Sequence, residues 1–179
     1  MDFNLTEQQL MMQKLFREVA QNEVKENAAD VDENERFPKE SVEVMRQAKM
    51  LGIPYSREYG GAGADYLCYI LAIEELSKTC ATSGVVLSAH TSLGTWPIAQ
   101  FGTEEQKQRF LTDLCTGKKL AAFGLTEPNA GTDAAGQQTT AVLDGDEYVI
   151  NGTKIFITNA GEAAVSYTHL RAHETAANL

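Results

Sequence analysis

The chain is poor in several features that would assign it to a particular class of protein. It has three cysteines and four prolines in 179 residues, and acidic residues outnumber basic ones by 25 to 15. The cysteines, Cys68, Cys80 and Cys115, form no CxxC pair and are odd in number, so neither a zinc site nor a disulfide-stabilised secreted scaffold is favoured. The formal net charge of −10 disfavours nucleic acid and anionic membrane surfaces as partners.

Long hydrophobic runs are also missing. No apolar stretch approaches the roughly 20 residues of a membrane span. The N-terminus is amphipathic and carries acidic residues early, so it does not resemble a signal peptide. We therefore expect a cytoplasmic protein without a membrane segment. With 43% hydrophobic residues the chain can bury a core, as one large domain or two small ones.

Helical signals dominate the first two thirds of the chain. Thr6 with Gln9 and Thr103 with Gln106 have the spacing of a capping box, in which side chains satisfy the free N–H groups at the start of a helix. Apolar residues recur at helical spacing after each box. The expected helices cover residues 7–25, 38–51, 66–77, 84–93, 97–102 and 104–114.

The hydrophobic period changes after Lys119. A short apolar run over 120–125 is typical of a buried strand. Asp144-Gly145 and Asn151-Gly152 are hairpin-turn signals, and Ile155 and Ile157 then alternate with polar or aromatic neighbours. The pattern predicts an antiparallel meander, with strands over 137–143, 147–150 and 153–158.

The segment AAFGLTEPNAGTDAAG, residues 121–136, is the strongest candidate for a ligand site. The apolar run breaks at Pro128, and the small residues that follow let backbone N–H groups approach a ligand oxygen. The hydroxyls of Thr126 and Thr132 can donate or accept. These features favour an anionic, phosphorylated ligand with a flat polar ring near the strand end. By spacing alone, an ordinary β-turn explains the segment equally well.

Glu127 lies within this segment and invites a catalytic interpretation. A carboxylate beside a phosphate-binding turn would repel the ligand, however. We therefore interpret Glu127 as a carboxylate that accepts hydrogen bonds from loop amides.

Two motifs resemble a known family. GLTEPNAGTDAAG (Gly124 to Gly136, the signature segment) resembles the signature of acyl-CoA dehydrogenases at every defined position. YVINGTKIFITNAG (Tyr148 to Gly161, the second motif) resembles a further characteristic stretch of that family, in the expected order and interval. The N-terminal run and GTEEQKQRFL are similar to it as well. The resemblance covers about residues 1–164 and is closest to bacterial short-chain, butyryl-CoA-type members.

The resemblance implies an α+β multidomain protein. Residues 1–118 would form an all-α N-terminal domain and residues 119–164 the start of an antiparallel β-barrel middle domain, with the C-terminal helical domain absent. It also implies FAD as cofactor, a short-chain acyl-CoA substrate, an electron-transferring flavoprotein as partner and a homotetramer. In the family's reaction a glutamate removes the α-proton and the β-hydride passes to flavin N5, which gives the trans-2-enoyl-CoA.

The family's FAD contacts match eight positions of this chain. By resemblance, Thr126 serves the flavin ring, Thr158 lies near N5, and Thr132 touches both the cofactor and the acyl-CoA thioester. Many relatives have tryptophan at position 156, so Phe156 keeps the ring-packing role without the indole donor. The eight positions are Phe123, Leu125, Thr126, Gly131, Thr132, Phe156, Ile157 and Thr158.

Other candidate residues carry less weight. By resemblance the helix over 84–93 lines the acyl pocket, so Ala89, His90 and Leu93 could set the acyl chain length. A lone histidine at such a place is more often a buried group with satisfied hydrogen bonds. His169 and His173 have the spacing of two ligands on one helix face, but no third ligand lies nearby, so we predict no metal site.

The resemblance ends near Val165. The remaining residues, 165–179, lack a strand period and an apolar face, and we expect them to be disordered, unrelated translated sequence. The catalytic glutamate of butyryl-type members lies beyond residue 179, so we expect no catalytic residue here and no activity from this chain alone. Two alternatives stay open: a related flavin acyl-CoA oxidase or monooxygenase, and a non-catalytic helical interaction module.

Overall fold

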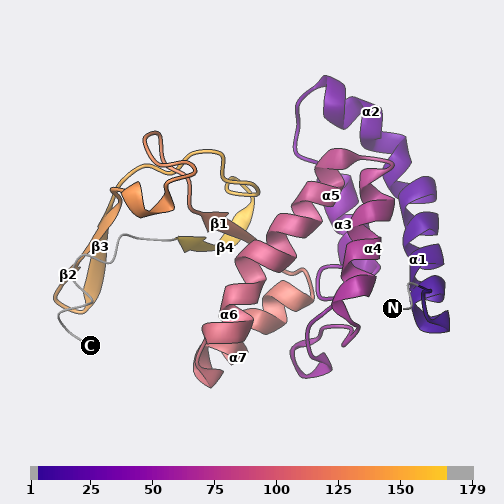
Figure 1. The fold of residues 1–179 in the computed structure, drawn as a ribbon, viewed down its shortest axis with the longest axis horizontal. Helices are drawn as coiled ribbons and strands as arrows, with labels where there is room; N and C mark the ends of the chain where they lie inside the picture. The colour runs from indigo at the N-terminus through magenta and orange to yellow at the C-terminus, as the bar shows by residue number, and fades with distance from the viewer. Residues whose placement is uncertain (1–3, 169–179) are drawn as a thin grey trace.

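The computed structural model describes residues 4–168. Its helices pack together as one body, and the strands with their loops extend to one side of it (Figure 1). The helices are α1 (Glu7–Val19), η1 (Ala20–Val24), α2 (Lys25–Glu33), α3 (Lys39–Gln47), η2 (Arg57–Tyr59), α4 (Tyr66–Ser77), α5 (Ala81–Ser88), η3 (Ala89–Thr95), α6 (Trp96–Phe101), α7 (Glu104–Cys115) and η4 (Ala134–Gly136). The strands are β1 (Leu120–Gly124), β2 (Thr140–Asp144), β3 (Glu147–Asn151) and β4 (Ala163–Thr168). η1 and η3 are π-helical, and η2 and η4 are 3-10 turns.

Both predicted capping boxes are confirmed. The Thr6 hydroxyl accepts from the Gln9 N–H at 3.2 Å, and the Gln9 side chain accepts from the Thr6 N–H at 2.9 Å. Thr103 and Gln106 repeat both bonds at the start of α7. These contacts span three residues, which is why sequence alone locates the helix starts. The helix expected over 66–77 is also confirmed, as α4.

The first helix is longer than predicted. α1 continues through the π-helical turn η1 into α2, so the helical stretch ends at Glu33 and not near Lys25. Val24 and Val31 are buried, which extends the apolar face past the expected end. The chain turns sharply just after the helix, at Glu35, whose φ is 48°.

The two helices expected over 84–93 and 97–102 form one continuous helical stretch, α5–η3–α6. Pro97 lacks an N–H and would clash with a carbonyl one turn earlier in a regular helix. Here the wider π-helical turn precedes it: the Trp96 N–H bonds the Thr91 carbonyl, and the Thr95 hydroxyl donates to the His90 carbonyl at 2.7 Å. The stretch therefore passes Pro97 without ending.

Two hydrophobic clusters hold the helices together, a large one over α1 to α5 and a smaller one of Tyr55, Leu111 and Cys115. α1 packs against α4, and α4 against α5. The three cysteines are free thiols and all are buried. The largest fully buried apolar side chains are Phe16, Met45, Met50, Leu51, Ile53, Leu76, Leu87, Leu111 and Leu114.

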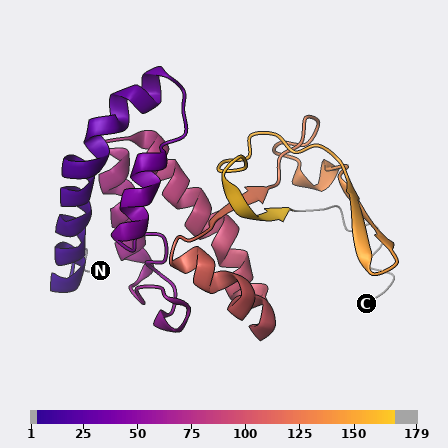
Figure 2. The same ribbon diagram turned by 180° about the vertical axis from the view of Figure 1, so that it is seen from behind.

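The strands form two separate two-stranded sheets. β2 and β3 make the predicted antiparallel hairpin, with Val142 opposite Val149, and its two-residue turn is Gly145-Asp146, one residue later than expected. β1 pairs with β4 in parallel, which the predicted antiparallel meander did not anticipate. Figure 2 shows β1 and β4 beside the helices and the β2–β3 hairpin farther out. Within residues 4–168 these two sheets do not close into a barrel.

The strand predicted over 153–158 is wrong, and so is the hairpin turn at Asn151-Gly152. Asn151 is the last residue of β3, and an irregular segment follows it. The Ile155 N–H donates to the Thr126 carbonyl at 2.9 Å, and Phe156 has a φ of 57°, so the chain turns away from an extended course. Alternating hydrophobicity could not reveal this, because the turn depends on a partner about 30 residues away.

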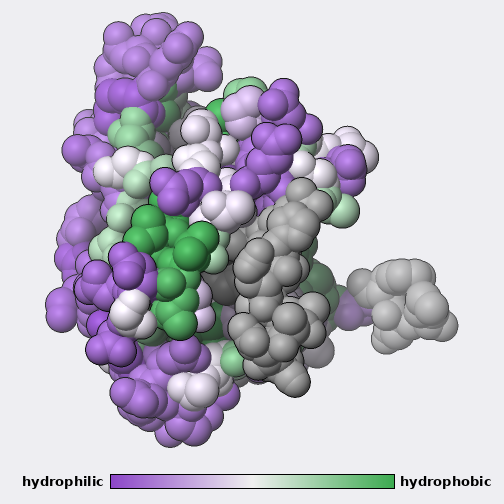
Figure 3. Space-filling model, turned by 90° about the vertical axis from the view of Figure 1, so that its left-hand side faces the viewer, coloured by the Kyte–Doolittle hydropathy of each residue, from purple (hydrophilic) through white to green (hydrophobic). Residues whose placement is uncertain are grey.

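The β2–β3 hairpin is uncovered within the described part of the chain. Figure 3 shows an apolar patch on the face that carries it. The exposed apolar side chains of the hairpin are Val142, Leu143, Tyr148, Val149 and Ile150. A hairpin of this kind needs further strands or another layer to be stable.

Candidate functional site

The signature segment begins at the end of β1. The strand is buried against η3, where a side chain at Gly94 would place its Cβ 2.4 Å from the Cβ of Ala121. This close approach needs glycine at position 94. The turn that follows is tight: Glu127 and Ala130 exchange both backbone hydrogen bonds, at 3.0 and 3.1 Å. The predicted strand followed by a tight turn is therefore confirmed.

Glu127 is a loop-holding carboxylate, as predicted. It is 6% exposed and accepts the N–H groups of Gln138 at 2.6 Å and Thr139 at 3.0 Å. Contacts with Thr139, Gln138 and Lys154, in decreasing order of effect, lower the pKa of Glu127 to about 2. The carboxylate is thus ionised and fully engaged with protein donors, which fits a structural role.

Lys154 is the residue that sequence reasoning missed. Its ammonium lies 2.9 Å from a Glu127 carboxylate oxygen and 2.8 Å from each of the Leu125 carbonyl and the Gln137 side-chain oxygen. The predicted strand put Lys154 on a polar face, whereas the chain turns it inward. A lysine next to Ile155 in an alternating stretch carries no signal for such a contact.

The backbone around Gly131 is open, as a phosphate-binding turn requires. A Cβ at Gly131 would meet no atom within 4 Å, and both Gly131 and Thr132 are exposed. Within residues 4–168, no acceptor is bound by the N–H groups of these two residues. Two adjacent free donors on a small-residue turn fit the diphosphate of a dinucleotide such as FAD.

The second motif presents an uncovered aromatic side chain. Phe156 is 87% exposed, while Ile157 and Thr158 beside it are half-buried. The adjacent Asn159 side-chain amide donates to the carbonyls of Val86 at 3.4 Å and Ala121 at 3.2 Å. These bonds fix the second motif to α5 and β1, and the free Phe156 ring can serve as the apolar wall of a flat ligand.

The three predicted acyl-pocket residues differ in accessibility. Ala89 is buried and His90 is fully buried, whereas Leu93 is 46% exposed. His90 Nδ1 accepts the Ala121 N–H at 3.1 Å, so the neutral ring carries its proton on Nε2, which lies 3.2 Å from the Leu114 carbonyl. Burial lowers the pKa of His90 to about 4. Its ring is closed to a ligand in this structure, and a direct substrate contact by His90 has no support.

Two cavities adjoin the candidate residues. One, of about 450 Å³, lies behind the signature turn and includes Glu127, Asn129 and Thr139 in its lining. The other, of about 370 Å³ and mainly apolar, lies between α5 and the second motif, where Val85, Val86 and Thr158 meet. The second cavity brings one predicted flavin contact next to the helix predicted to line the acyl pocket.

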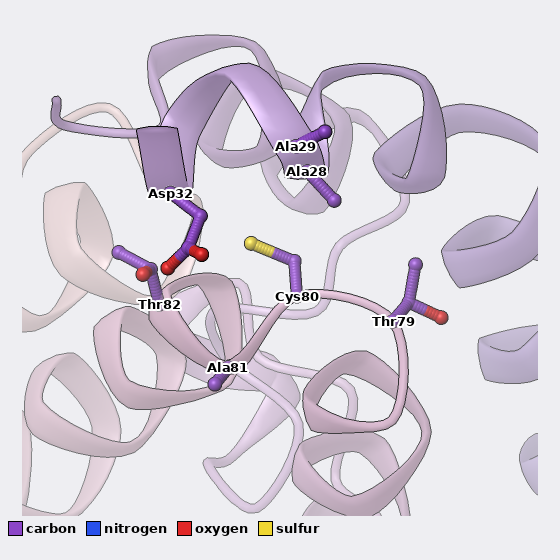
Figure 4. A pocket seen from close by; sticks show the side chains of 7 residues that line it. All are labelled: Ala28, Ala29, Asp32, Thr79, Cys80, Ala81 and Thr82. Atoms are coloured by element: carbon purple, nitrogen blue, oxygen red, sulfur yellow. The ribbon is translucent and has the colours of Figure 1, made fainter. Parts of the chain in front are cut away.

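A third cavity, between α2 and the start of α5, contains none of the predicted residues (Figure 4). Its volume is about 340 Å³, and its lining includes the Asp32 carboxylate and the buried Cys80 thiol. This lining is unsuited to an anionic phosphate.

Neither a metal cluster nor a membrane-spanning helix occurs in the described part of the chain. In the described part of the chain, no group of three or more His, Cys, Asp or Glu side chains is placed to hold a metal ion. His169 and His173 lie outside it. None of the helices within residues 4–168 is long and apolar enough to cross a bilayer.

Comparison with known proteins gives a consistent result along the chain. The profile of the acyl-CoA dehydrogenase N-terminal domain matches residues 6–118, and that of the acyl-CoA dehydrogenase middle domain matches residues 122–178. The second match runs past Val165, where the motif resemblance ends, and β4 (Ala163–Thr168) also crosses that position. Residues 169–179 lie outside the described part of the structure, so the expectation for the tail stays a prediction.

Individual relatives agree with these profiles. The short-chain specific acyl-CoA dehydrogenase of Clostridium acetobutylicum is 63% identical over 163 residues, which is 91% of this chain and 43% of the relative. Butyryl-CoA dehydrogenase from Megasphaera elsdenii superposes with a TM-score of 0.92 at 44% identity, over 98% of this chain and 47% of that one. An acyl-CoA dehydrogenase complexed with FAD from Bacillus anthracis superposes with a TM-score of 0.86 at 36% identity, over 93% of this chain and 30% of that one.

The chain spans less than half the length of these curated relatives. The profile of the N-terminal domain alone nevertheless covers more than half of this chain, and the helical body and signature turn described above agree with it. This chain belongs to the acyl-CoA dehydrogenase family.

Proposed function

We propose that this chain supplies the N-terminal domain and the first part of the middle domain of an FAD-dependent short-chain acyl-CoA dehydrogenase. The observation that carries the proposal is the junction of the two motifs: Lys154 bonds the Leu125 carbonyl, and the Ile155 N–H bonds the Thr126 carbonyl. These bonds support a shared flavin site, because they hold Leu125 and Thr126 beside the start of the second motif. The 63% identity to a short-chain enzyme supports the substrate class.

The residues of this chain bind and orient the cofactor. The free N–H groups of Gly131 and Thr132 would hold the diphosphate of FAD, and Leu125 and Thr126 would serve its ring. Phe156, with Ile157 and Thr158 beside it, would supply the apolar wall. When bound, FAD supplies the hydride acceptor for the reaction.

The substrate is a short-chain acyl-CoA, and the product is the trans-2-enoyl-CoA. Thr132 contacts the thioester, and the exposed Leu93 side chain meets the acyl group. His90 is left out because both of its ring nitrogens bond the backbone. None of the residues matched to the family is the glutamate that removes the α-proton. The complete protein is a homotetramer that passes electrons to an electron-transferring flavoprotein.

A hybrid protein tests this proposal. Residues 1–164 of this chain would be joined to the rest of the Clostridium acetobutylicum relative, and FAD content and butyryl-CoA-dependent dye reduction would be measured. We expect a yellow, active hybrid. A hybrid that folds but retains no FAD would refute the proposal, and oxygen consumption in place of dye reduction would favour an acyl-CoA oxidase.

The chain by itself provides the complementary test. Its visible spectrum would be recorded after gel filtration in the presence of FAD. We expect a colourless product, because in this proposal the chain supplies only part of the contacts that hold FAD. Stable yellow flavin at one equivalent per chain would contradict the claim that this chain holds only part of the site.

A further inference from the structure

Lys154 is a nearly buried ammonium with every donor in use. Its side chain is 11% exposed, and that of its partner Glu127 is 6% exposed. The three acceptors lie at 2.8, 2.8 and 2.9 Å, which is close to ideal for charge-assisted hydrogen bonds. No proton of the ammonium is left for a phosphate, so Lys154 is not suited to bind the anionic part of a ligand directly.

The acceptors of Lys154 come from separate segments of the chain. Leu125 and Glu127 flank Thr126 in the signature segment, and Gln137 lies beyond η4. The Glu127 carboxylate in turn accepts the N–H groups of Gln138 and Thr139. The ammonium and carboxylate therefore connect the signature segment, the entrance to β2 and the second motif.

Both peptide groups of Thr126 are fixed by this arrangement. The Leu125 carbonyl, on one side of the Thr126 Cα atom, accepts from Lys154 at 2.8 Å. The carbonyl of Thr126 itself, on the other side, accepts from the Ile155 N–H at 2.9 Å. Because both peptide planes are held, the backbone dihedral angles of Thr126 are restricted. These angles orient its Cα–Cβ bond.

A role in geometry explains such a pair better than a role in stability. Desolvating two charges offsets most of their attraction, so a buried ion pair contributes little net stability compared with apolar side chains of the same volume. Removing one partner, in contrast, leaves an uncompensated buried charge. The ion pair makes these three segments adopt one mutual arrangement.

We propose that Lys154 is a positioning residue of the flavin site, whose ammonium fixes Thr126 and the start of the second motif in one mutual arrangement. The inference rests on the proposed function only for the identity of the ligand. The mutual arrangement of the segments is independent of it, because that arrangement can be measured in the chain without cofactor.

The test uses hydrogen exchange on the full chain. In Lys154→Met the exchange of the Ile155, Gln138 and Thr139 amides should become about tenfold to hundredfold faster, because charged hydrogen bonds that order these loops are lost. Amides of α1 and α4 should exchange as before. Lys14→Met is the matched control, since Lys14 is 77% exposed and lies 3.9 Å from Glu18. Unchanged exchange at the three amides would overturn the proposal.

A double variant separates positioning from stability. Lys154→Met with Glu127→Gln removes both charges and should recover most of the unfolding temperature that Lys154→Met loses. The three amides should stay fast, because the ammonium that joins the segments is still absent. Recovery of amide protection together with stability would show that Lys154 only balances a charge, and would overturn the positioning role.

The hybrid protein adds a spectroscopic readout. Lys154→Met in the hybrid should bind FAD at least about tenfold more weakly and shift the visible band of the bound flavin. Equal affinity and an identical spectrum would contradict the inference while leaving the proposed function intact. If the unmodified hybrid takes up no FAD, the proposed function fails, and the amide exchange result still decides the role of Lys154.

Discussion

Replacing His90 should reveal how the helical body supports β1. The imidazole is fully buried and links the Ala121 N–H of β1 to the Leu114 carbonyl at the end of α7. His90→Leu keeps a side chain of similar size but leaves the Ala121 N–H buried and unpaired, whereas the Leu114 carbonyl keeps the Gly117 N–H at 3.0 Å. One such unpaired group costs about 1–3 kcal/mol, so the variant should lose about 1–3 kcal/mol of unfolding free energy. That is a measurable part of the roughly 5–15 kcal/mol typical of a domain.

The pH dependence gives this prediction a second, independent part. Burial lowers the pKa of His90 from 6.5 to about 4 in the folded chain. The unfolded chain therefore takes up a proton below pH 6.5 that the folded chain refuses until about pH 4, so stability falls as the pH falls through this window. Between pH 7 and pH 5 this linkage should cost the unmodified chain about 2 kcal/mol, and His90→Leu should not show that loss.

Urea unfolding followed by the fluorescence of Trp96, the single tryptophan, measures both effects. Other titrating groups are shared by the two chains and cancel in the difference. Ser83→Ala is the control, because Ser83 is fully buried and its hydroxyl has no partner within residues 4–168. It should change neither stability nor the pH slope appreciably. Equal stability of His90→Leu and the unmodified chain, or a difference that does not shrink from pH 7 to pH 5, would refute the reasoning.

Three further predictions concern other contacts. Gly94→Val should lower the unfolding free energy by about 1–3 kcal/mol or more, since its Cβ would meet Ala121 at 2.4 Å; an unchanged urea midpoint would argue against the close η3–β1 contact. Glu127, whose pKa is lowered to about 2, should stabilise the loops above about pH 4.5 and lose this effect as the pH falls toward 2; amide exchange of Gln138 in the unmodified chain and in Glu127→Gln should therefore converge at low pH. Leu87→Ala, at a fully buried position of the helical core, should cost about 2–5 kcal/mol in the same urea assay, and a loss below 1 kcal/mol would show that the surrounding core can collapse around the gap.

The helical part of the fold could be predicted from sequence because its signals are local. The capping boxes at Thr6 and Thr103 and the helix over 66–77 depend on residues three or four positions apart. The β2–β3 hairpin is similar, since a glycine at position 145 with a φ of 63° permits the tight turn. The motif residues also predicted the turn at Glu127–Ala130. They predicted as well that the Glu127 carboxylate accepts hydrogen bonds from loop amides.

Distant partners decided the rest. Phe156 leaves the strand geometry because Ile155 bonds the carbonyl of Thr126. His90 is a structural residue because Ala121 and Leu114 meet its two nitrogens.

The sequence by itself determined the family, the helices and the two motifs, because these are written in residue identity and short spacing. Only the tertiary structure joined the motifs through Lys154, because a lysine's role depends on which acceptors surround its ammonium once the chain has folded. Three oxygens converge on that group from residues 17 to 29 positions earlier in the chain, and no local pattern encodes their meeting.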